Sequence, residues 1–284
     1  MIISVASGKG GTGKTTIATA LASSLGSGVQ LLDCDVEEPN AHLFIKPVFD
    51  ETETVTTPVP EVDPKKCSLC GKCGEICQFK AIVMISDFVM CFHELCHSCG
   101  GCVAVCPENA VTETARELGT IRKSSRNGLE LVCGTLKIGE AMSPPLIRKV
   151  RSFAVQEKIT IIDAPPGTSC PVIASLKETD FVLLVTEPTP FGLHDLKLAV
   201  EAVRKLNIPG GLIINRSDIG DDRVAEYAHK ENLPILMEIP FDRKIAEACS
   251  RGKLITEALP ELKQKFEELY HAVIQIIKKQ EQFE

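Results

Sequence analysis

Two runs of cysteine occupy the middle of the chain, and both have the same spacing. In each run, three cysteines are separated by two residues and a fourth follows after three more, giving Cys67, Cys70, Cys73 and Cys77, then Cys96, Cys99, Cys102 and Cys106. Three thiolates at this spacing can bind three corners of one iron–sulfur cubane, and the fourth then points toward a second cluster. The pattern predicts two [4Fe–4S] clusters.

Zinc and disulfides are the alternative interpretations of these cysteines. Pairs of Cys-x-x-Cys also build tetrahedral zinc sites, but zinc needs four ligands and does not explain this spacing of four cysteines occurring twice. Disulfides are less favoured, because Met1 leads directly into an apolar segment with nothing that resembles a secretory signal. The 13 cysteines therefore indicate a reducing, cytoplasmic setting with little oxygen.

A phosphate-binding loop is predicted at the start of the chain. The apolar run Ile2–Ala6 is followed by Ser-Gly-Lys-Gly-Gly-Thr-Gly-Lys-Thr-Thr at residues 7–16. Between a strand and a helix, glycines let backbone N–H groups face phosphate oxygens, and the helix start adds its positive end. We expect Lys14 to reach the β- and γ-phosphates and Thr15 to ligate Mg²⁺. The full set expected around the phosphates is Gly10, Gly11, Thr12, Gly13, Lys14, Thr15 and Thr16.

Acidic residues follow two other predicted strands. One apolar run ends at Asp33, with Asp35 two residues later, and a second ends at Asp163. A carboxylate at a strand end can hold Mg²⁺ or orient the attacking water. We expect Asp35 to position water, Asp33 to have a structural or metal-side role, and Asp163 to hold Mg²⁺ through water. Gly167 is expected to present its N–H to the γ-phosphate, so that its loop distinguishes ATP from ADP.

The base of the nucleotide is less firmly predicted than its phosphates. Asn215 ends the apolar run that begins at Gly211, and its side-chain amide can donate and accept, as the edge of adenine requires. An ordinary turn-initiating asparagine is the alternative. Residues 239–242, Ile-Pro-Phe-Asp, follow the next apolar run and also fit a loop on the base side.

The elements that must position these residues alternate along the chain. Short apolar runs predict strands at residues 2–6, 29–32, 159–163, 181–185, 211–214 and 235–239. Strands that alternate with helices predict an α/β fold with a doubly wound, mostly parallel sheet covered on both faces. At the carboxyl end, apolar side chains recur at helical spacing and predict an amphipathic helix packed on the core: Leu262, Phe266, Leu269, Val273 and Ile276.

The cysteine runs interrupt this alternation. Because Asp63-Pro64 breaks regular structure just before them, we predict a discontinuous nucleotide-binding domain at residues 1–60 and 115–284. A small α+β domain is then inserted at residues 61–114. After it, Asn127-Gly128 predicts a tight turn within a hairpin over residues 119–137.

The composition fits a soluble globular protein. The chain has 284 residues, of which 44% are hydrophobic and 24% are charged, so it can bury a substantial core. A net charge of −7 argues against a large nucleic-acid surface. No apolar stretch approaches the roughly 20 residues that span a bilayer, so we expect no membrane span.

The phosphate loop resembles that of a known family. Lys9, which precedes the glycines, is similar to the signature lysine of the MinD/ParA family, which also includes the nitrogenase iron protein and the Mrp/ApbC-type iron–sulfur carriers. Together with the acidic motifs in their order, it makes nearly the whole chain resemble MinD-superfamily ATPases with an inserted ferredoxin domain. The resemblance implies Mg²⁺-dependent ATP hydrolysis. It also implies an ATP-dependent homodimer in which Lys9 contacts the nucleotide of the other subunit.

The inserted segment resembles the dicluster ferredoxins of bacteria. The residues after each run repeat one another, as in that family. The resemblance assigns one cluster to Cys67, Cys70, Cys73 and Cys106, and the other to Cys77, Cys96, Cys99 and Cys102. Gln78 replaces the proline that usually follows the first run, which leaves the ligands intact but could alter the turn and the reduction potential.

Cysteines outside the two runs carry a weaker hypothesis. Cys170 follows Asp163 at the spacing of a cluster-bridging cysteine in the nitrogenase iron protein, and Cys133 lies roughly where a second such ligand belongs. Two thiols from each subunit of a dimer could hold a further cluster. The alternative is that both pack as small apolar residues, which is what we expect of Cys34, Cys91 and Cys249.

Three functions are compatible with these patterns. In each, nucleotide-driven switching of a dimer is coupled to the two clusters. The first and favoured function is assembly or delivery of a metallocluster to an acceptor protein. The second is ATP-gated electron transfer to a redox partner, and the third is a regulatory or positioning ATPase that senses redox state. The sequence does not identify the protein partner.

Overall fold

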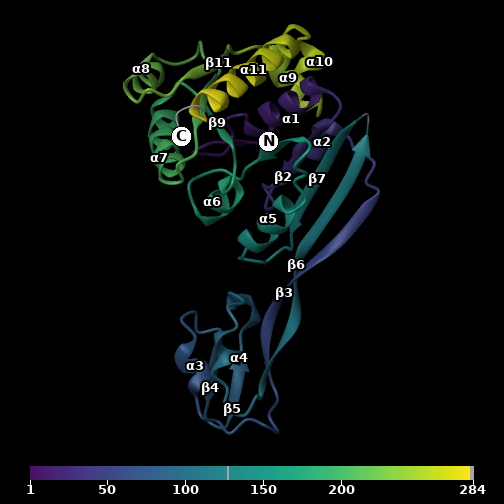
Figure 1. Cartoon of the computed structure of the whole chain (residues 1–284), viewed down its shortest axis with the longest axis vertical. Helices are drawn as coiled ribbons and strands as arrows, with labels where there is room; N and C mark the ends of the chain where they lie inside the picture. Colours follow the sequence, from purple (N-terminus) through teal and green to yellow (C-terminus); the bar gives the residue numbers. More distant parts are fainter. Residues whose placement is uncertain (127, 282–284) are drawn as a thin grey trace. The chain divides into compact units, whose positions relative to one another are not determined.

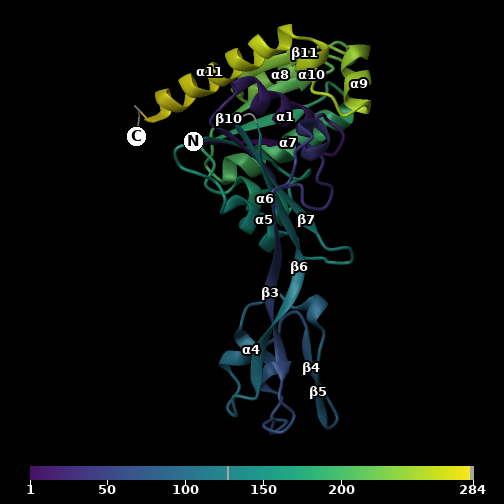
Figure 2. The same cartoon turned by 90° about the vertical axis from the view of Figure 1, so that its right-hand side faces the viewer.

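A computed structural model describes residues 1–126 and 128–281, which form two compact units (Figures 1 and 2). The larger unit comprises Met1–Glu53, Ile121–Thr135 and Ile147–Glu284. The smaller unit comprises Thr54–Thr120 and Leu136–Leu146. Asn127, the first residue of the predicted tight turn, lies outside the described residues.

Within the described residues, nine strands form one sheet in the order β11-β10-β9-β1-β8-β2-β7-β6-β3. The strands are β1 (Ile2–Ala6), β2 (Val29–Asp33), β3 (Glu51–Val62), β6 (Val111–Arg126), β7 (Leu129–Leu136), β8 (Ile159–Asp163), β9 (Phe181–Thr186), β10 (Gly210–Asn215) and β11 (Ile235–Ile239). Every neighbouring pair from β11 to β7 is parallel. The prediction of a mostly parallel, doubly wound sheet is therefore confirmed.

Both faces of this sheet are buried under helices, because successive side chains of a strand point to opposite faces. In β9, Phe181, Leu183 and Val185 pack in the core that contains α1 (Lys14–Leu25) and α11 (Glu261–Glu281). Val182 and Leu184 pack in a second core with residues of α6, α7 and α8. Figure 1 shows α11, in yellow, beside α1. The predicted carboxyl-terminal helix is confirmed.

The other helices of the larger unit are α2 (Ala41–Ile45), α6 (Cys170–Leu176), α7 (Pro190–Lys205), α8 (Arg223–Lys230), α9 (Arg243–Ser250) and α10 (Ile255–Ala258), and α5 (Pro144–Arg151) begins in the smaller unit. Local sequence sets two of their starts. The Thr189 hydroxyl accepts the Gly192 N–H at 3.0 Å at the start of α7, and Asp242 accepts the Lys244 N–H at 2.7 Å at the start of α9. None of the helices in residues 1–126 and 128–281 is long and apolar enough to cross a membrane.

The smaller unit contains short elements around the cysteines. These are α3 (Lys72–Ile76), the antiparallel pair β4 (Ile82–Ile85) and β5 (Phe88–Cys91), the 3-10 helix η1 (His93–Leu95) and α4 (Gly101–Ala104). Its buried centre consists of Cys73, Ile82 and Val111, with seven more cysteine and valine side chains packed against them from the cysteine runs and strands. The fold of this unit is thus built directly on its cysteine-bearing loops.

Strand β3 was not predicted from the sequence. Its buried side chains Val55, Thr57 and Val59 alternate with exposed ones, which is the period of a strand. The prolines at 58 and 60 obscure this pattern, since proline cannot donate to a neighbouring strand. They are tolerated because β3 is the last strand in the sheet order and has a free edge. Strand β6 also begins at Val111, earlier than the predicted hairpin, and it does lie next to β7.

Candidate functional site

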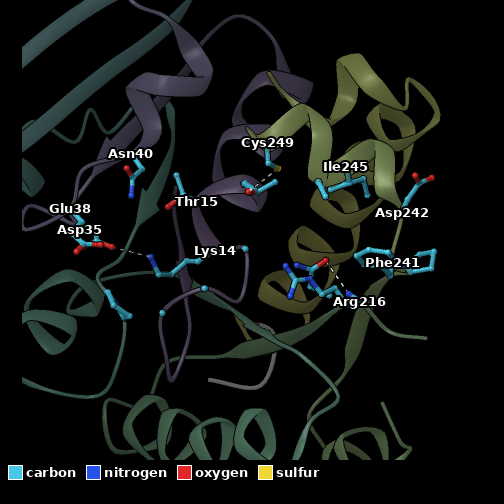
Figure 3. A pocket seen from close by; sticks show the side chains of 18 residues that line it. Lys14, Thr15, Asp35, Glu38, Asn40, Arg216, Phe241, Asp242, Ile245 and Cys249 are labelled. Carbon is cyan, nitrogen blue, oxygen red and sulfur yellow. Dashed lines mark hydrogen bonds and ion pairs between the residues drawn. The ribbon is translucent and has the colours of Figure 1, made fainter. Parts of the chain in front are cut away.

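The loops that follow β1, β2, β8, β10 and β11 line a cavity of about 360 Å³ (Figure 3). Parallel strands bring their carboxyl ends to one edge of the sheet, where such folds bind ligands. Of the residues predicted to bind nucleotide, those that line the cavity are Gly10, Gly11, Gly13, Lys14, Thr15, Thr16, Asp35 and Asn215. Thr12, Asp33, Asp163, Gly167 and Lys9 do not line it.

The phosphate loop has a shape that only glycine allows at its last turn. Gly13 has a φ of 92°, and a Cβ atom there would lie 2.6 Å from the Asn215 side-chain nitrogen. That nitrogen donates to the Thr12 carbonyl at 2.9 Å, and the Asn215 side-chain oxygen accepts the Arg216 N–H at 3.1 Å. One N–H and one lone pair of the amide remain for a base. Asn215 therefore closes the phosphate loop as well as facing the cavity.

Lys14 lies between two carboxylates. Its Nζ is 3.4 Å from Asp35 Oδ2 and 3.4 Å from Asp163 Oδ1, and its side chain is 7% exposed. Burial acts to lower the pKa of Lys14, but the negative charges of Asp163, Asp35 and Asp33 outweigh it, so that the pKa is raised. The ammonium group stays charged, and phosphate oxygens entering the cavity would compete with these carboxylates for it.

Asp163 and Thr15 fit a magnesium site. Asp163 ends β8 with no exposed surface, and although its Oδ1 faces Lys14, its Oδ2 has no hydrogen-bond partner. A buried carboxylate oxygen without a partner is costly unless water or a cation satisfies it. Thr15 lines the cavity at the start of α1. The donor set is therefore of the oxygen type that Mg²⁺ binds.

Asp33 has a structural role. Its Oδ2 accepts the Ala41 N–H at 3.0 Å and its Oδ1 accepts the Asp35 N–H at 3.2 Å, so both oxygens are occupied by the backbone. Burial raises the pKa of Asp33 well above its usual range, and the charge of Asp163 raises it further. This carboxylate ties the start of α2 and the Asp35 loop to the end of β2.

Asp35 is the carboxylate best placed to act in the cavity. Burial raises its pKa to about 6, while Lys14 lowers this value and Asp163 raises it. The carboxylate has 13% exposure and faces the same space as Thr15. It is ionised at neutral pH and can accept a hydrogen bond from a water molecule beside the phosphates.

Two predicted residues have other partners in this structure. The Lys9 Nζ lies 3.8 Å from Glu187 Oε2, and Glu187 Oε1 lies 2.9 Å from Arg216 Nη1. The Gly167 N–H, expected to face the γ-phosphate, donates to the Ser7 carbonyl at 2.9 Å. Both contacts must break before Lys9 or Gly167 can reach a nucleotide.

Several cavity residues were not predicted. They are Glu38, Asn40, Pro166, Arg216, Ile245, Ala246 and Cys249, whereas Pro240, Phe241 and Asp242 belong to the predicted base-side loop. Arg216 is adjacent to Asn215, so proximity could have suggested it. Cys249 has no local signal, because it comes into the site only through its contact with Thr16 (Sγ to Oγ1, 3.7 Å), 233 residues away in sequence. Cys249 also packs, partly buried, against the hydrophobic core, as expected of it from the sequence.

In the smaller unit, one cavity collects four of the eight predicted cluster cysteines. It is lined by Cys77, Cys96, Cys99 and Cys102, the set that the resemblance assigned to one cluster. In the other set, the pKa of Cys73 is raised, mainly by burial. The N–H groups of Gly74 and of Cys73 itself oppose this effect, and the charges of Cys67 and Cys70 add to it. These two neighbouring sulfurs are therefore close to Cys73. Cys77, Cys96, Cys99 and Cys102 thus share one cavity, and Cys67, Cys70 and Cys73 lie near one another.

The two runs have the same hydrogen bonds at an interval of 29 residues, the separation of Cys77 from Cys106. The Ala81 N–H donates to Cys77 Sγ at 3.3 Å, and the Ala110 N–H donates to Cys106 Sγ at 3.2 Å. Burial acts to raise the pKa of both thiols, but the backbone N–H groups around each sulfur outweigh it and lower the pKa. Donors aimed at sulfur stabilise the thiolate form, which is the form that binds iron.

The two halves of the unit also exchange backbone hydrogen bonds. The Asp63 N–H donates to the Ala110 carbonyl at 2.8 Å, and the equivalent Phe92 N–H donates to the Ala81 carbonyl at 2.7 Å. Asp63 and Phe92 each precede one cysteine run, and Ala110 and Ala81 each lie four residues after the last cysteine of the opposite run. The last cysteine of each run is therefore held near the start of the opposite run. This geometry fits the crossed ligand assignment. No three His, Cys, Asp or Glu side chains of the described residues converge on a single metal-ion position.

The hypothesis of a further cluster held by Cys133 and Cys170 needs correction. Cys133 lies in the core beneath the sheet with no exposed surface, and burial raises the pKa of its thiol strongly. Cys170 is exposed at the start of α6. A thiol inside the core cannot reach the surface where two subunits meet, so Cys133 is excluded from such a site.

Comparison with known proteins identifies the family of the larger unit. Residues 3–255 match the family described as the CobQ/CobB/MinD/ParA nucleotide binding domain. The chain belongs to this family. The predicted membership of the MinD/ParA superfamily is therefore confirmed.

Individual relatives support the same fold. The uncharacterized protein MJ0579 of Methanocaldococcus jannaschii is 31% identical over 265 residues, covering 89% of this chain and 90% of the relative. The iron-sulfur cluster carrier protein of Aquifex aeolicus is 26% identical over 283 residues, covering 92% of this chain and 63% of the carrier. The septum site-determining protein MinD of Pyrococcus horikoshii, solved with Mg-ADP, is similar with a TM-score of 0.60 and 22% identity, and the match covers 96% of this chain and 95% of MinD.

Proposed function

We propose that this protein is a Mg²⁺-dependent ATPase whose nucleotide state controls two [4Fe–4S] clusters, and that it assembles or delivers a metallocluster. The clusters belong to an inserted dicluster ferredoxin domain at residues 61–114. The observation that carries the proposal is the cavity lined by Cys77, Cys96, Cys99 and Cys102 in a chain with a MinD/ParA nucleotide site. The relative named iron-sulfur cluster carrier protein supports delivery as the output.

In the nucleotide site, ATP replaces the carboxylates that hold Lys14. Lys14 Nζ moves from Asp35 and Asp163 to the β- and γ-phosphates, where its charge offsets theirs. Thr15 and Asp163 then hold Mg²⁺. Asp35, released from Lys14, orients a water molecule whose oxygen bonds to the γ-phosphorus. The bond from that phosphorus to the β–γ bridging oxygen breaks, which leaves ADP and inorganic phosphate.

ATP also drives formation of a homodimer in this proposal. Lys9 leaves Glu187, to which it is paired at 3.8 Å, and contacts the nucleotide of the other subunit. Gly167 gives up the Ser7 carbonyl and donates to the γ-phosphate. Hydrolysis removes both interactions, so the dimer opens. We place this cycle in the cytoplasm, where free thiols persist.

The smaller unit holds the clusters through its two sets of cysteines. Cys67, Cys70, Cys73 and Cys106 bind one cluster, and Cys77, Cys96, Cys99 and Cys102 bind the other. Such clusters supply one-electron chemistry when bound, or are themselves the cargo that is passed on. The Ala81 and Ala110 N–H groups keep their sulfurs in the thiolate form that iron needs.

ATP-gated electron transfer is the second candidate. Cys73, Cys77, Cys102 and Cys106, two from each set, pack in one apolar cluster around Ile82 and Val111. Ligands of both predicted clusters therefore meet in one apolar group of side chains. An electron could therefore pass from one cluster to the other, and this favours a redox output as the alternative to delivery.

The test begins with anaerobically purified protein. Two cubanes require about eight iron and about eight sulfide per chain. The loaded protein is then mixed with apo-aconitase under MgATP or MgADP, and aconitase activity is followed with the iron lost from the donor. Delivery predicts activation that depends on MgATP. Retention of clusters under MgATP would refute delivery, and a nucleotide-dependent rate of electron donation in the same samples would support the alternative. Zinc without sulfide would overturn the cluster assignment itself.

A further inference from the structure

The two cysteine runs have equivalent backbones, so their side chains decide how they differ. Several backbone hydrogen bonds recur in residues 63–82 and 92–111 at the interval of 29 residues, such as Lys80 N–H to the Cys77 carbonyl and Asn109 N–H to the Cys106 carbonyl. Positive φ values recur at equivalent positions, with 57° at Leu69 and 56° at Ser98. In a symmetric pair of sites, any asymmetry of charge distinguishes the partner that each site meets.

The charges of the two segments are opposite. Segment 63–82 has four lysines, at 65, 66, 72 and 80, against two acids, Asp63 and Glu75. Segment 92–111 has two acids, Glu94 and Glu108, and neither lysine nor arginine. The positions equivalent to the four lysines are occupied by Glu94, Leu95, Gly101 and Asn109. The first run is thus a local basic region in a chain whose net charge is −7.

These lysines are available to a partner. All four are exposed, and in the described part of the chain the only ion pair among them joins Lys66 to Asp63 at 3.8 Å. Lys65 and Lys72 flank Cys70, whose side chain is also exposed. Lysines therefore lie on both sides of an exposed predicted cluster ligand in the sequence.

An apolar side chain lies beside the same loop. Met84 of β4 is 46% exposed, and its Cε would be 3.7 Å from a Cβ atom on Gly71, next to Cys70. Protein interfaces combine an apolar centre with a polar rim, and methionine adapts to different partners. Lysine clusters that bind anionic membranes lie beside a membrane-spanning helix or on an amphipathic helix. These lysines lie instead in the loops around the first cysteine run and in α3, a helix of five residues.

We propose that the surface formed by Lys65, Lys66, Lys72 and Met84 is the docking site for a partner protein with an acidic surface. The lysines steer the partner to the cluster assigned to Cys67, Cys70, Cys73 and Cys106, and Met84 supplies the apolar contact. The second run, with its acidic surroundings, repels the same partner. This inference rests on the proposed function, because it assigns the exchange with a partner to one of the two clusters.

The test uses the full-length, cluster-loaded protein under anaerobic conditions, with two haem proteins as probes. Acidic cytochrome b5 and basic cytochrome c are compared for their dissociation constants at about 20 and about 200 mM salt. Stopped-flow absorbance then follows electron transfer after reduction of the clusters with dithionite. In each event one cluster loses one electron and one ferric haem becomes ferrous.

The lysines are tested by the double variant Lys65→Glu/Lys72→Glu. We expect its binding of cytochrome b5 to weaken about tenfold at low salt, with a similar loss of the bimolecular electron-transfer rate. The matched control Lys263→Glu/Lys265→Glu changes the net charge equally on exposed positions of α11, and we expect less than about a twofold effect. Far-UV circular dichroism checks that both variants are folded.

Several outcomes would overturn the proposal. Equal weakening by both double variants would mean that net charge, and not this surface, attracts the partner. Tighter binding of cytochrome c, or of vesicles of phosphatidylglycerol, than of cytochrome b5 would identify a different class of partner. Iron and sulfide analysis of the same samples separates the two proposals: absence of clusters refutes the proposed function, while the binding comparison still decides the docking surface.

Discussion

Replacing Asp35 with asparagine tests the charge arrangement of the nucleotide site. In the nucleotide-free protein, three carboxylates, Asp33, Asp35 and Asp163, surround the single ammonium group of Lys14. Burial therefore raises the pKa of Asp35 to about 6 from its ordinary value of 3.8. Asparagine keeps the shape and an oxygen acceptor for Lys14 but cannot ionise.

The raised pKa determines the sign of the effect. The folded protein binds the Asp35 proton more tightly than the unfolded chain, so this contribution to stability is complete below pH 3.8 and is lost as the pH rises through about 6. With a pKa of about 6 in the folded protein and 3.8 in the unfolded chain, the free energy of unfolding falls by about 1.4 kcal/mol between about pH 5 and about pH 8. At a slope near 2 °C per kcal/mol for a chain of this size, the change in thermal midpoint is about 3 °C.

The assay compares the thermal midpoints of wild-type protein and Asp35→Asn without nucleotide, anaerobically and at one scan rate. We expect the midpoint of Asp35→Asn relative to wild type to rise by about 3 °C between about pH 5 and about pH 8. ATP hydrolysis by Asp35→Asn should fall at least about 100-fold, because a neutral amide oxygen is a weaker acceptor for the water than a carboxylate and cannot take up its proton. Glu157→Gln, at an exposed position, is the control and should follow wild type at both pH values. If Asp35→Asn also follows wild type, the buried charge arrangement around Lys14 is refuted.

Three further substitutions test other parts of the structure. Gly13→Ala places a Cβ atom at a φ of 92° against an amide nitrogen, so fluorescent ATP should no longer bind, whereas Gly10→Ala has open space at this atom and should still bind it. Equal binding by both variants would contradict the loop geometry. Cys77→Ala should lower the iron content from about eight to about four per chain, while Cys170→Ala leaves it unchanged. The converse result would reverse the ligand assignment. Phe266→Ala removes a fully buried ring from α11 and should lower the free energy of unfolding in urea by about 3–5 kcal/mol. A loss below about 1 kcal/mol would mean that α11 is not packed as described.

The parallel strands of the larger unit were predictable because both of their faces are buried. Such strands are continuous apolar runs, and the predicted ranges 159–163 and 235–239 match β8 and β11 residue for residue. The edge strand β3 was not predictable in the same way. Its threonines and prolines alternate with valines, and only its place at the end of the sheet makes that pattern acceptable.

The sequence by itself determined the chemistry of the two sites. The phosphate loop lies within ten consecutive residues, and each cysteine run spans eleven, so local spacing is enough to indicate phosphate binding and cluster ligation. The family match confirmed the first of these. The second remains a prediction, supported by the way in which the cysteines gather.

Tertiary structure alone decided which groups meet. Lys14 contacts Asp163 across 149 positions of the chain, and Thr16 contacts Cys249 across 233. Neither distance can be inferred from spacing, because both depend on the order in which the strands assemble into the sheet. The same assembly placed Cys133 inside the core and Cys170 on the surface. A side chain's type is fixed by the sequence, but its burial and its partners are set only when distant elements pack together.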